Sequence, residues 1–163
     1  MEKIKTVGIM SDSHDNMIAI QKAVDIFNQK KVDLVIHAGD LIAPFTAREL
    51  KKLNCPLIIT FGNNDGEIIG LSKVFDGQIF YPPHQIIVND KKVLILHDPI
   101  LLEELQQNSN FDVIIYGHLH KAEIKDGKPL IINPGECGGW LYGKSTIAIW
   151  DTETDKVELI EIK

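Results

Sequence analysis

The chain has 163 residues, of which 44% are apolar and 25% charged, values typical of one compact domain over residues 1–163. They exclude a disordered chain, a collagen-like repeat and a coiled coil, and the formal net charge of −6 without a basic cluster argues against a nucleic-acid-binding domain. A chain of this length buries roughly two-thirds of its unfolded surface, so it can fold without the help of a bound metal. Any metal ligands in it are therefore explained by chemistry rather than by stability.

Short β-branched runs alternate with helical patterns along the chain. In chain order we expect a strand over 4–10, a helix over 17–30, a strand over 33–38, a helix over 44–53, strands over 57–61, 85–88 and 93–96, a helix over 101–107, and strands over 113–116, 130–133, 146–150 and 157–162. Ile20, Val24 and Phe27 recur at helical spacing in the first helix, and Pro44 opens the second. Early βαβ units followed by strand-rich segments predict a sheet-based α/β fold.

Residues with metal-binding side chains directly follow five of these strands. In open α/β sheets the ligand crevice lies beyond the carboxyl ends of the strands, so these side chains are expected to meet at one edge. Gly39, Gly62 and Gly117 each precede one of them, where a missing Cβ permits a tight turn and close backbone approach. The set is Asp12, His14, Asp40, Asn63, His97, His118 and His120.

The number and type of these side chains indicate a pair of divalent ions. Side-chain direction repeats every second residue in an extended segment, so the Asp-x-His and His-x-His spacings let two side chains reach one centre. Seven nitrogen and oxygen ligands are too many for one four- or five-coordinate ion and suit two ions that share a carboxylate. Two divalent ions outweigh the charges of Asp12 and Asp40, so the site favours an anionic substrate such as a phosphate ester.

These residues carry a family resemblance. Asp12-x-His14, Gly39-Asp40, Gly62-Asn63, His97 and Gly117-His118-x-His120 resemble the five-block signature of calcineurin-like metallophosphoesterases, over nearly the whole chain. The chain is most similar to the small single-domain phosphodiesterases of archaea and bacteria, and the segment Asn133-Pro134-Gly135-Glu136 also resembles that branch. The resemblance implies an α/β fold of the metallo-dependent phosphatase type, a four-layer αββα sandwich with two packed mixed sheets and outer helices.

The resemblance also implies the arrangement of the centre. One ion would be held by Asp12, His14 and His120, the other by Asn63, His97 and His118, and Asp40 would bridge the two. A hydroxide between the ions would attack phosphorus, which makes the protein a metal-dependent phosphodiesterase. Nitrogen-rich ligation favours manganese, with nickel, iron, cobalt and zinc as alternatives, over magnesium.

Two positions depart from the family pattern. Many members place a histidine, thought to protonate the leaving group, where this chain has Asn64. An amide can contact a phosphoryl oxygen but cannot supply a proton near neutral pH, so we expect a preference for leaving groups such as phenols. Glycine often follows the His97 position, whereas here Asp98-Pro99 follows. The Asp98 carboxylate is expected to turn outward to solvent, with a hydrogen bond to His97 as the alternative, and the second metal site is expected to bind its ion less tightly.

Other functions remain open at this stage. A phosphomonoesterase would need extra cationic clamps, and Arg48 is the single guanidinium. A protein-binding scaffold with a degraded site, as in a retromer subunit, is disfavoured because all seven ligands are retained. His37 is interpreted as a packed residue or one that supports a ligand, and Cys137, Trp140 and Tyr142 as packing residues, with a place in the lining of the substrate pocket as the alternative. His84 is interpreted as a loop residue, and Asp65 as either orienting Asn64 or capping a turn.

The remaining expectations concern compartment and partners. No apolar stretch reaches the ~18–20 residues that cross a bilayer, and no secretory signal precedes the first strand. Cys55 and Cys137 lack zinc-like spacing and are expected to be free thiols in a reducing cytoplasm. The expected partner is a small phosphate-ester substrate, not a membrane, and apolar residues over 74–81 leave a homo-oligomer open.

Overall fold

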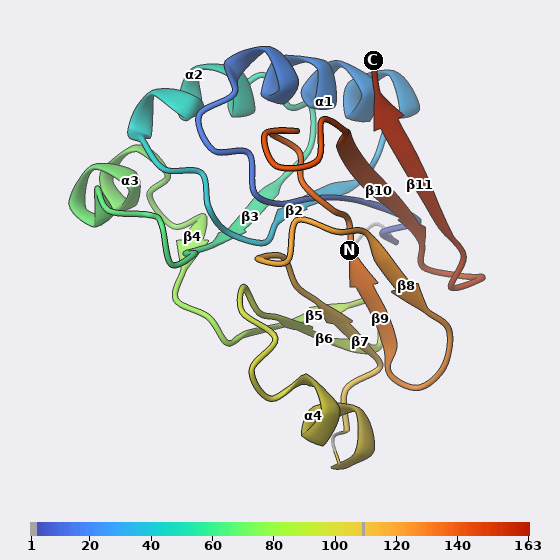
Figure 1. Cartoon of the computed structure of the whole chain (residues 1–163). Helices are drawn as coiled ribbons and strands as arrows, with labels where there is room; N and C mark the ends of the chain where they lie inside the picture. Colours follow the sequence, from blue (N-terminus) through green and yellow to red (C-terminus); the bar gives the residue numbers. More distant parts are fainter. Residues whose placement is uncertain (1–2, 109) are drawn as a thin grey trace.

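The computed structural model describes residues 3–108 and 110–163 and contains two mixed sheets (Figure 1). In the six-stranded sheet the order is β11 (Val157–Ile162), β10 (Ser145–Asp151), β1 (Thr6–Met10), β2 (Leu34–His37), β3 (Leu57–Thr60) and β4 (Ile79–Phe80). In the five-stranded sheet it is β5 (His84–Val88), β6 (Lys91–Ile95), β7 (Val113–Ile115), β9 (Leu130–Asn133) and β8 (Glu123–Lys125). In the first sheet β1 to β4 run parallel to one another, and in the second β6, β7 and β9 do.

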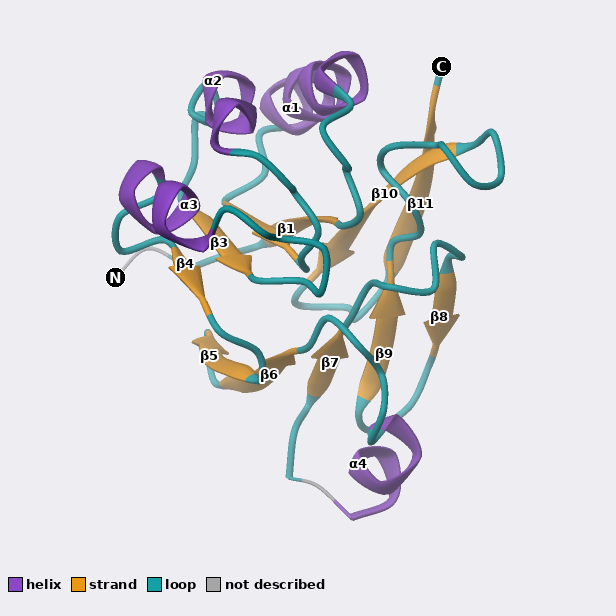
Figure 2. Ribbon diagram, turned by 60° about the vertical axis from the view of Figure 1, so that its left-hand side comes forward, coloured by secondary structure: helices purple, strands orange, loops and turns teal. Residues whose placement is uncertain are grey.

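Helices cover the outer faces of the two sheets (Figure 2). The helices α1 (Met17–Lys30), α2 (Ala47–Leu50) and α3 (Ile68–Val74) lie on the six-stranded sheet, and α4 (Leu102–Asn108) lies on the five-stranded one. A buried cluster that includes Ile9, Ile36 and Trp150 from the first sheet and Ile95 and Ile132 from the second joins the inner faces. The expected four-layer αββα sandwich is therefore confirmed.

Burial on both faces explains why the central strands read as continuous apolar runs. Every residue of β2 and of β9 is buried, because one face packs on helices and the other on the opposite sheet. Helix α1 begins at the Asn16 cap, whose side chain accepts a hydrogen bond from the backbone N–H of Ala19, and buries its Ile20, Val24 and Phe27 face as expected. The packing of these layers fixes the positions of the strand ends, and therefore the positions at which the following loops begin.

The expected elements are present, and the structure adds three short ones. All nine expected strands and the first and third helices occur within a few residues of the expected bounds. The helix expected over 44–53 is a 3₁₀ turn (Pro44–Thr46) followed by α2, which ends at Leu50. The sequence gives no periodic signal for β4, β8 and α3, which have two, three and seven residues.

The apolar segment over residues 74–81 lies partly in the core. Residues 74–81 were candidates for an interface, but Phe75 is fully buried and packs with Leu71 in the core beneath α3. Only Tyr81 of this segment is a strongly exposed large apolar side chain.

Among the helices that the structure describes, none combines the length and the apolar character required to cross a membrane.

Candidate metal centre

The loops that follow β1, β2, β3, β6 and β7 are joined by hydrogen bonds, which for the loop after β3 involve the side chains of Asp40 and Asp65. The N–H of Asp12 donates to the carbonyl of Gly39 at 3.0 Å, and that of His14 donates to Asp40 at 3.1 Å. Within the five-stranded sheet the N–H of Gly117 donates to the carbonyl of His97 at 3.1 Å, and across the two sheets the N–H of Gly138 donates to the carbonyl of Asp12 at 3.0 Å. The expected meeting of strand ends therefore occurs, and it joins loops of both sheets.

The backbone of this loop cluster is strained where the candidate ligands lie. Asp12, His14, Asp40, His118 and His120 all have positive φ, between 41° and 67°. Non-glycine residues rarely adopt this conformation, which costs of order 1–3 kcal/mol each and persists only when surrounding contacts fix it. Such strain concentrated on five of the seven candidates marks a functional site.

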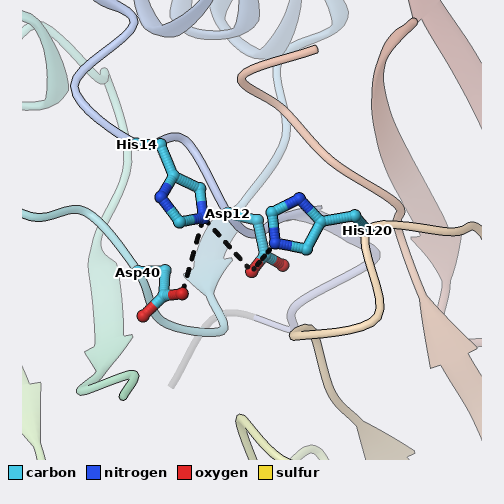
Figure 3. A group of neighbouring side chains, drawn as sticks. All are labelled: Asp12, His14, Asp40 and His120. Carbon is cyan, nitrogen blue, oxygen red and sulfur yellow. Dashed lines mark ion pairs between the residues drawn. The ribbon is translucent and has the colours of Figure 1, made fainter. Parts of the chain in front are cut away.

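A first group of side chains converges on a common point (Figure 3). Nε2 of His14 lies 3.8 Å from Oδ1 of Asp12 and 3.5 Å from Oδ2 of Asp40, and Nε2 of His120 lies 3.5 Å from the same Oδ1 of Asp12. One ligand atom from each of the four residues lies within 4.8 Å of the others. Ligands bound at ~2.1 Å to a tetrahedral ion are about 3.4 Å apart, so these distances suit a metal ion.

The nitrogen of His14 in this group supports that interpretation. Nε2 of His14 is buried and has no hydrogen-bond partner among the described residues, although two carboxylates lie close to it. A buried polar atom without a partner is costly, and a bound cation would satisfy it. Asp12, followed by Asp40, raises the pKa of His14 above its usual value, because both carboxylates stabilise the imidazolium.

A second group lies on the other side of Asp40. Oδ1 of Asn63 is 2.9 Å from Nε2 of His97 and 2.9 Å from Nδ1 of His118. Nε2 of His97 is in turn 3.4 Å from Oδ2 of Asp40. The structure thus brings all seven candidate residues together, as two sets on either side of one carboxylate.

The ring of His97 indicates what this second group binds. Its Nδ1 donates to the carbonyl oxygen of Ala38 at 2.8 Å, which leaves Nε2 facing Asn63 Oδ1 and Asp40 Oδ2, both of them acceptors. In a neutral ring protonated on Nδ1, Nε2 carries a lone pair, so the arrangement requires either a second ring proton or a cation. Burial lowers the pKa of His97, but the hydrogen bond and charge of Asp40 outweigh it and raise that pKa above its usual value.

Asp40 carries a negative charge in a position without solvent exposure. Burial alone would raise the pKa of this carboxyl, but His97 and two hydrogen bonds from Asn64 hold it well below its usual range. The N–H of Asn64 donates to Oδ1 at 2.8 Å and its amide Nδ2 donates to Oδ2 at 2.7 Å. Asp40 is therefore an ionised carboxylate that contacts both groups.

Two glycines are required by the closeness of these loops. A Cβ on Gly117 would lie 1.9 Å from Oγ of Ser11 and 2.6 Å from Oδ2 of Asp12. A Cβ on Gly62 would lie 2.1 Å from Oδ1 of Asp40. Neither position can hold a side chain without displacing a candidate ligand, which confirms the expected close approach.

The structure adds two acidic residues whose roles the sequence left undecided or unassigned. Asp65 is buried and accepts hydrogen bonds from the N–H groups of Gly62, Asp40 and Ile42, so it fixes the Asp40 loop rather than orienting Asn64. Glu136 accepts from the N–H groups of Trp140 and Leu141, and its Oε1 lies 3.2 Å from Nδ1 of His120. Glu136 is thus placed to orient His120, and its position in the Asn-Pro-Gly-Glu segment was the available signal.

The structure decides several interpretations that the sequence left open. The Asp98 carboxylate is exposed as expected, with Oδ2 3.9 Å from Nε2 of His118. His37 is fully buried: Nδ1 accepts from the N–H of Gly39 and Nε2 contacts Ser13 Oγ, and burial lowers its pKa to about 4. Arg48 is 81% exposed and contacts only its neighbour Glu49 among the charged groups described.

Other packing interpretations had mixed outcomes. Cys137 is fully buried in the core, as expected. Trp140 and Tyr142 are 65% and 59% exposed, so the interpretation of these two as packing residues is wrong. His84 is the first residue of β5, not a loop residue, and its ring stacks on Phe80 at 4.0 Å.

Comparisons with known proteins agree with this geometry. The calcineurin-like phosphoesterase superfamily domain matches residues 6–155. The chain belongs to this superfamily. The phosphodiesterase MJ0936 of Methanocaldococcus jannaschii is 40% identical over 154 residues, which cover 90% of this chain and 93% of the relative. This calcineurin-like phosphoesterase is therefore an enzyme of the family whose signature the sequence resembles.

Solved structures show the same fold. An archaeal phosphodiesterase superposes with a TM-score of 0.88 at 38% identity, covering 96% of this chain and 99% of that chain. Vps29 of Chaetomium thermophilum, at 16% identity, superposes with a TM-score of 0.69 and covers 96% and 94%. At 16% identity, the comparison with Vps29 shows a shared fold and nothing more.

Replacing Asp65 with Asn should weaken metal binding. An amide has one oxygen for the three backbone N–H donors that Asp65 now accepts, so the Asp40 loop loses its support. We expect the affinity for Mn²⁺, measured by isothermal titration calorimetry, to fall about 10–100-fold with an unchanged circular dichroism spectrum. The exposed acid Asp76 offers the matched control, Asp76→Asn. An unchanged affinity in Asp65→Asn would show that the loop needs no such support.

Metal binding should release protons near neutral pH. Asp12 and Asp40 raise the pKa of His14, and Asp40 raises that of His97 against burial, so both rings retain a proton to a higher pH than free histidine. A cation has to displace those protons, so affinity should fall as pH decreases through neutrality. Calorimetry in two buffers of different ionisation enthalpy should show proton release at about pH 6.5 and almost none at about pH 9. Identical heats in both buffers at the lower pH would contradict this.

Proposed function

We propose that this protein is a metal-dependent phosphodiesterase whose two divalent ions share the Asp40 carboxylate. Asp12, His14 and His120 hold one ion, and Asn63, His97 and His118 hold the other. The observation that carries the proposal is the pair of imidazole nitrogens, His14 Nε2 and His97 Nε2, that face acceptor oxygens at 2.9 to 3.8 Å. A pair of cations would satisfy both nitrogens and also balance the charges of Asp12 and Asp40.

Bound at this site, two divalent ions would lower the pKa of a shared water molecule and offset charge on the phosphoryl oxygens. The chain's own residues keep the site in place for that chemistry. Asp65 fixes the Asp40 loop, the Ala38 carbonyl sets the His97 ring, and Glu136 lies beside His120. These groups are buried, so the candidate ligands need little rearrangement on binding.

Asn64 is the one candidate for direct contact with the substrate outside the ligand set. Its Nδ2 donates to Asp40 Oδ2 and its side chain is exposed, so the amide lies at the open side of the site. From there it can donate a hydrogen bond to a phosphoryl oxygen, and it holds no proton to give to a leaving group. The enzyme therefore favours leaving groups that depart without protonation.

The charge around the site favours a diester over a monoester. A monoester dianion needs additional cationic groups, and the guanidinium of Arg48 is exposed and turned to Glu49. Asp98 adds a negative charge 3.9 Å from His118. A singly charged diester meets less repulsion there than a dianion.

The remaining parts of the proposal concern metal, compartment and domain. Four histidines in the set favour a transition-metal ion over magnesium. Among these ions we propose manganese, with nickel, iron, cobalt and zinc as alternatives that metal availability would decide. Cys55 and Cys137 are free thiols, in agreement with a reducing cytoplasm. Burial raises the pKa of the Cys137 thiol to about 12, so this thiol is not a nucleophile near neutral pH. We assign residues 1–163 to one domain, because the two sheets share a core, and a small phosphate ester as substrate.

The metal requirement can be tested directly. Protein purified without chelator should contain a divalent metal by inductively coupled plasma analysis and hydrolyse bis-p-nitrophenyl phosphate faster than p-nitrophenyl phosphate. Chelation should abolish activity, Mn²⁺ should restore it, and Asp40→Asn should lower kcat/KM by about 100-fold or more because both ions lose a charged ligand. Asp25→Asn, an exposed acid on α1, is the control. Activity that persists after chelation would refute the proposal.

The role of Asn64 predicts a dependence on the leaving group. Across diesters whose leaving groups increase in pKa from nitrophenols to alcohols, log(kcat) should fall steeply, because departure is not assisted by a proton. Asn64→His introduces a group that titrates near pH 6.5 and should raise the rate on alcohol leaving groups more than on phenols. Asn64→Ala is the control and should leave the slope unchanged. A flat dependence for the unaltered protein would show that another residue supplies the proton.

A further inference from the structure

Two hollows in the surface meet beside the second group of candidate ligands. The larger, of about 460 Å³, lies between β6 and α4, and six of its lining residues form what we call the apolar trough: Pro83, Leu96, Ile100, Leu101, Leu105 and Phe111. The smaller, of about 310 Å³, includes Asn63 and Tyr81. Pro82, His97 and Asp98 line both, so the trough is continuous with the candidate metal centre.

The apolar character of the trough is concentrated in one place. Ile100 and Leu101 are 78% and 58% exposed at its rim, and Leu96 and Leu105 lie within it. Single exposed apolar residues are common on protein surfaces, but a contiguous apolar lining of pocket size beside a reactive centre is typical of a ligand site. An apolar group that enters the trough would cover side chains that otherwise face water.

The charges near the trough restrict what can enter it. Asp98 is the one acidic residue in either lining, and neither lining contains Lys or Arg within the described chain. A second anionic group would therefore be repelled. The hollow beside His120 differs, because two lysines, Lys121 and Lys144, line it together with one acid, Glu161. The two sides of the centre thus present different chemistry to the two arms of a diester.

We propose that the apolar trough binds an uncharged alkyl or aryl ester arm of the substrate while the phosphate lies at the metal centre. This inference rests on the proposed phosphodiesterase function and names the class of diester, one with at least one apolar arm. Full burial of each methylene group in such a site would strengthen binding roughly fourfold. A longer arm should therefore bind more tightly until it fills the trough.

Symmetric dialkyl phosphates test the trough without regard to which arm leaves. They are singly charged, differ only in chain length and are hydrolysed far more slowly than nitrophenyl esters. Calorimetry on the manganese-loaded protein should give a dissociation constant for dibutyl phosphate at least about tenfold lower than for dimethyl phosphate. In the double variant Ile100→Ser with Leu101→Ser that ratio should approach one, with dimethyl phosphate binding unchanged.

The matched control is Ile87→Ser on β5, because Ile87 is 56% exposed, close to the 58% of Leu101, and lies outside both linings. It should retain the chain-length dependence. Equal affinities for the two phosphates, or a dependence that survives in the double variant, would overturn the proposal. Analytical ultracentrifugation of the double variant gives a further test. A changed oligomeric state together with an intact chain-length dependence would also overturn the proposal, because the trough would then be an interface between copies.

Hydrolysis of bis-p-nitrophenyl phosphate, measured in parallel, separates the two proposals. Hydrolysis without chain-length dependence would reject the trough and keep the phosphodiesterase function. Chain-length-dependent binding without hydrolysis would keep the trough as a binding site for apolar phosphodiesters and reject the catalytic function.

Discussion

The buried charge of Asp40 is the constraint on which the centre depends. Its carboxylate has no exposure to solvent, yet His97 and Asn64 hold its pKa well below the usual range, so it stays ionised. An ionised buried group has to be compensated by nearby positive charge or by donors. Nε2 of His14 and Nε2 of His97 lie 3.5 and 3.4 Å from Oδ2 of Asp40, where a ring proton or a bound cation would provide that charge.

That compensation explains the strain of the surrounding backbone. Positive φ at Asp12, His14, Asp40, His118 and His120 turns the loops after three strands sharply enough to aim these side chains at the centre. The unfavourable conformations are held by hydrogen bonds between loops, by Asp65 beneath the Asp40 loop and by glycines at the closest approaches. Stability lost in the loops is offset by the fully buried strands behind them.

The sandwich also gives the centre two unlike sides. Loops of the six-stranded sheet carry Asp12, His14, Asp40 and Asn63, and loops of the five-stranded sheet carry His97, His118 and His120. The apolar trough lies where β6 leads into α4, next to His97, whereas lysines lie near His120. A fold by itself does not specify activity, so the side chains at this junction decide the chemistry.

Strand positions, the α/β class and the seven candidate ligands followed from the sequence, because alternation of apolar runs with polar strand ends is a local pattern. Asp12-x-His14 and His118-x-His120 were recognisable from spacing alone, and Gly62 and Gly117 from their place before a ligand. The short elements β4, β8 and α3 carry no such pattern and form only because neighbouring strands and the core stabilise them. Likewise Asp65, Glu136 and the exposure of Trp140 depend on contacts between distant loops. The sequence by itself determined which candidate ligands are present. Only the tertiary structure decided how they are oriented and what surrounds them, because orientation and burial depend on packing between segments far apart in the chain.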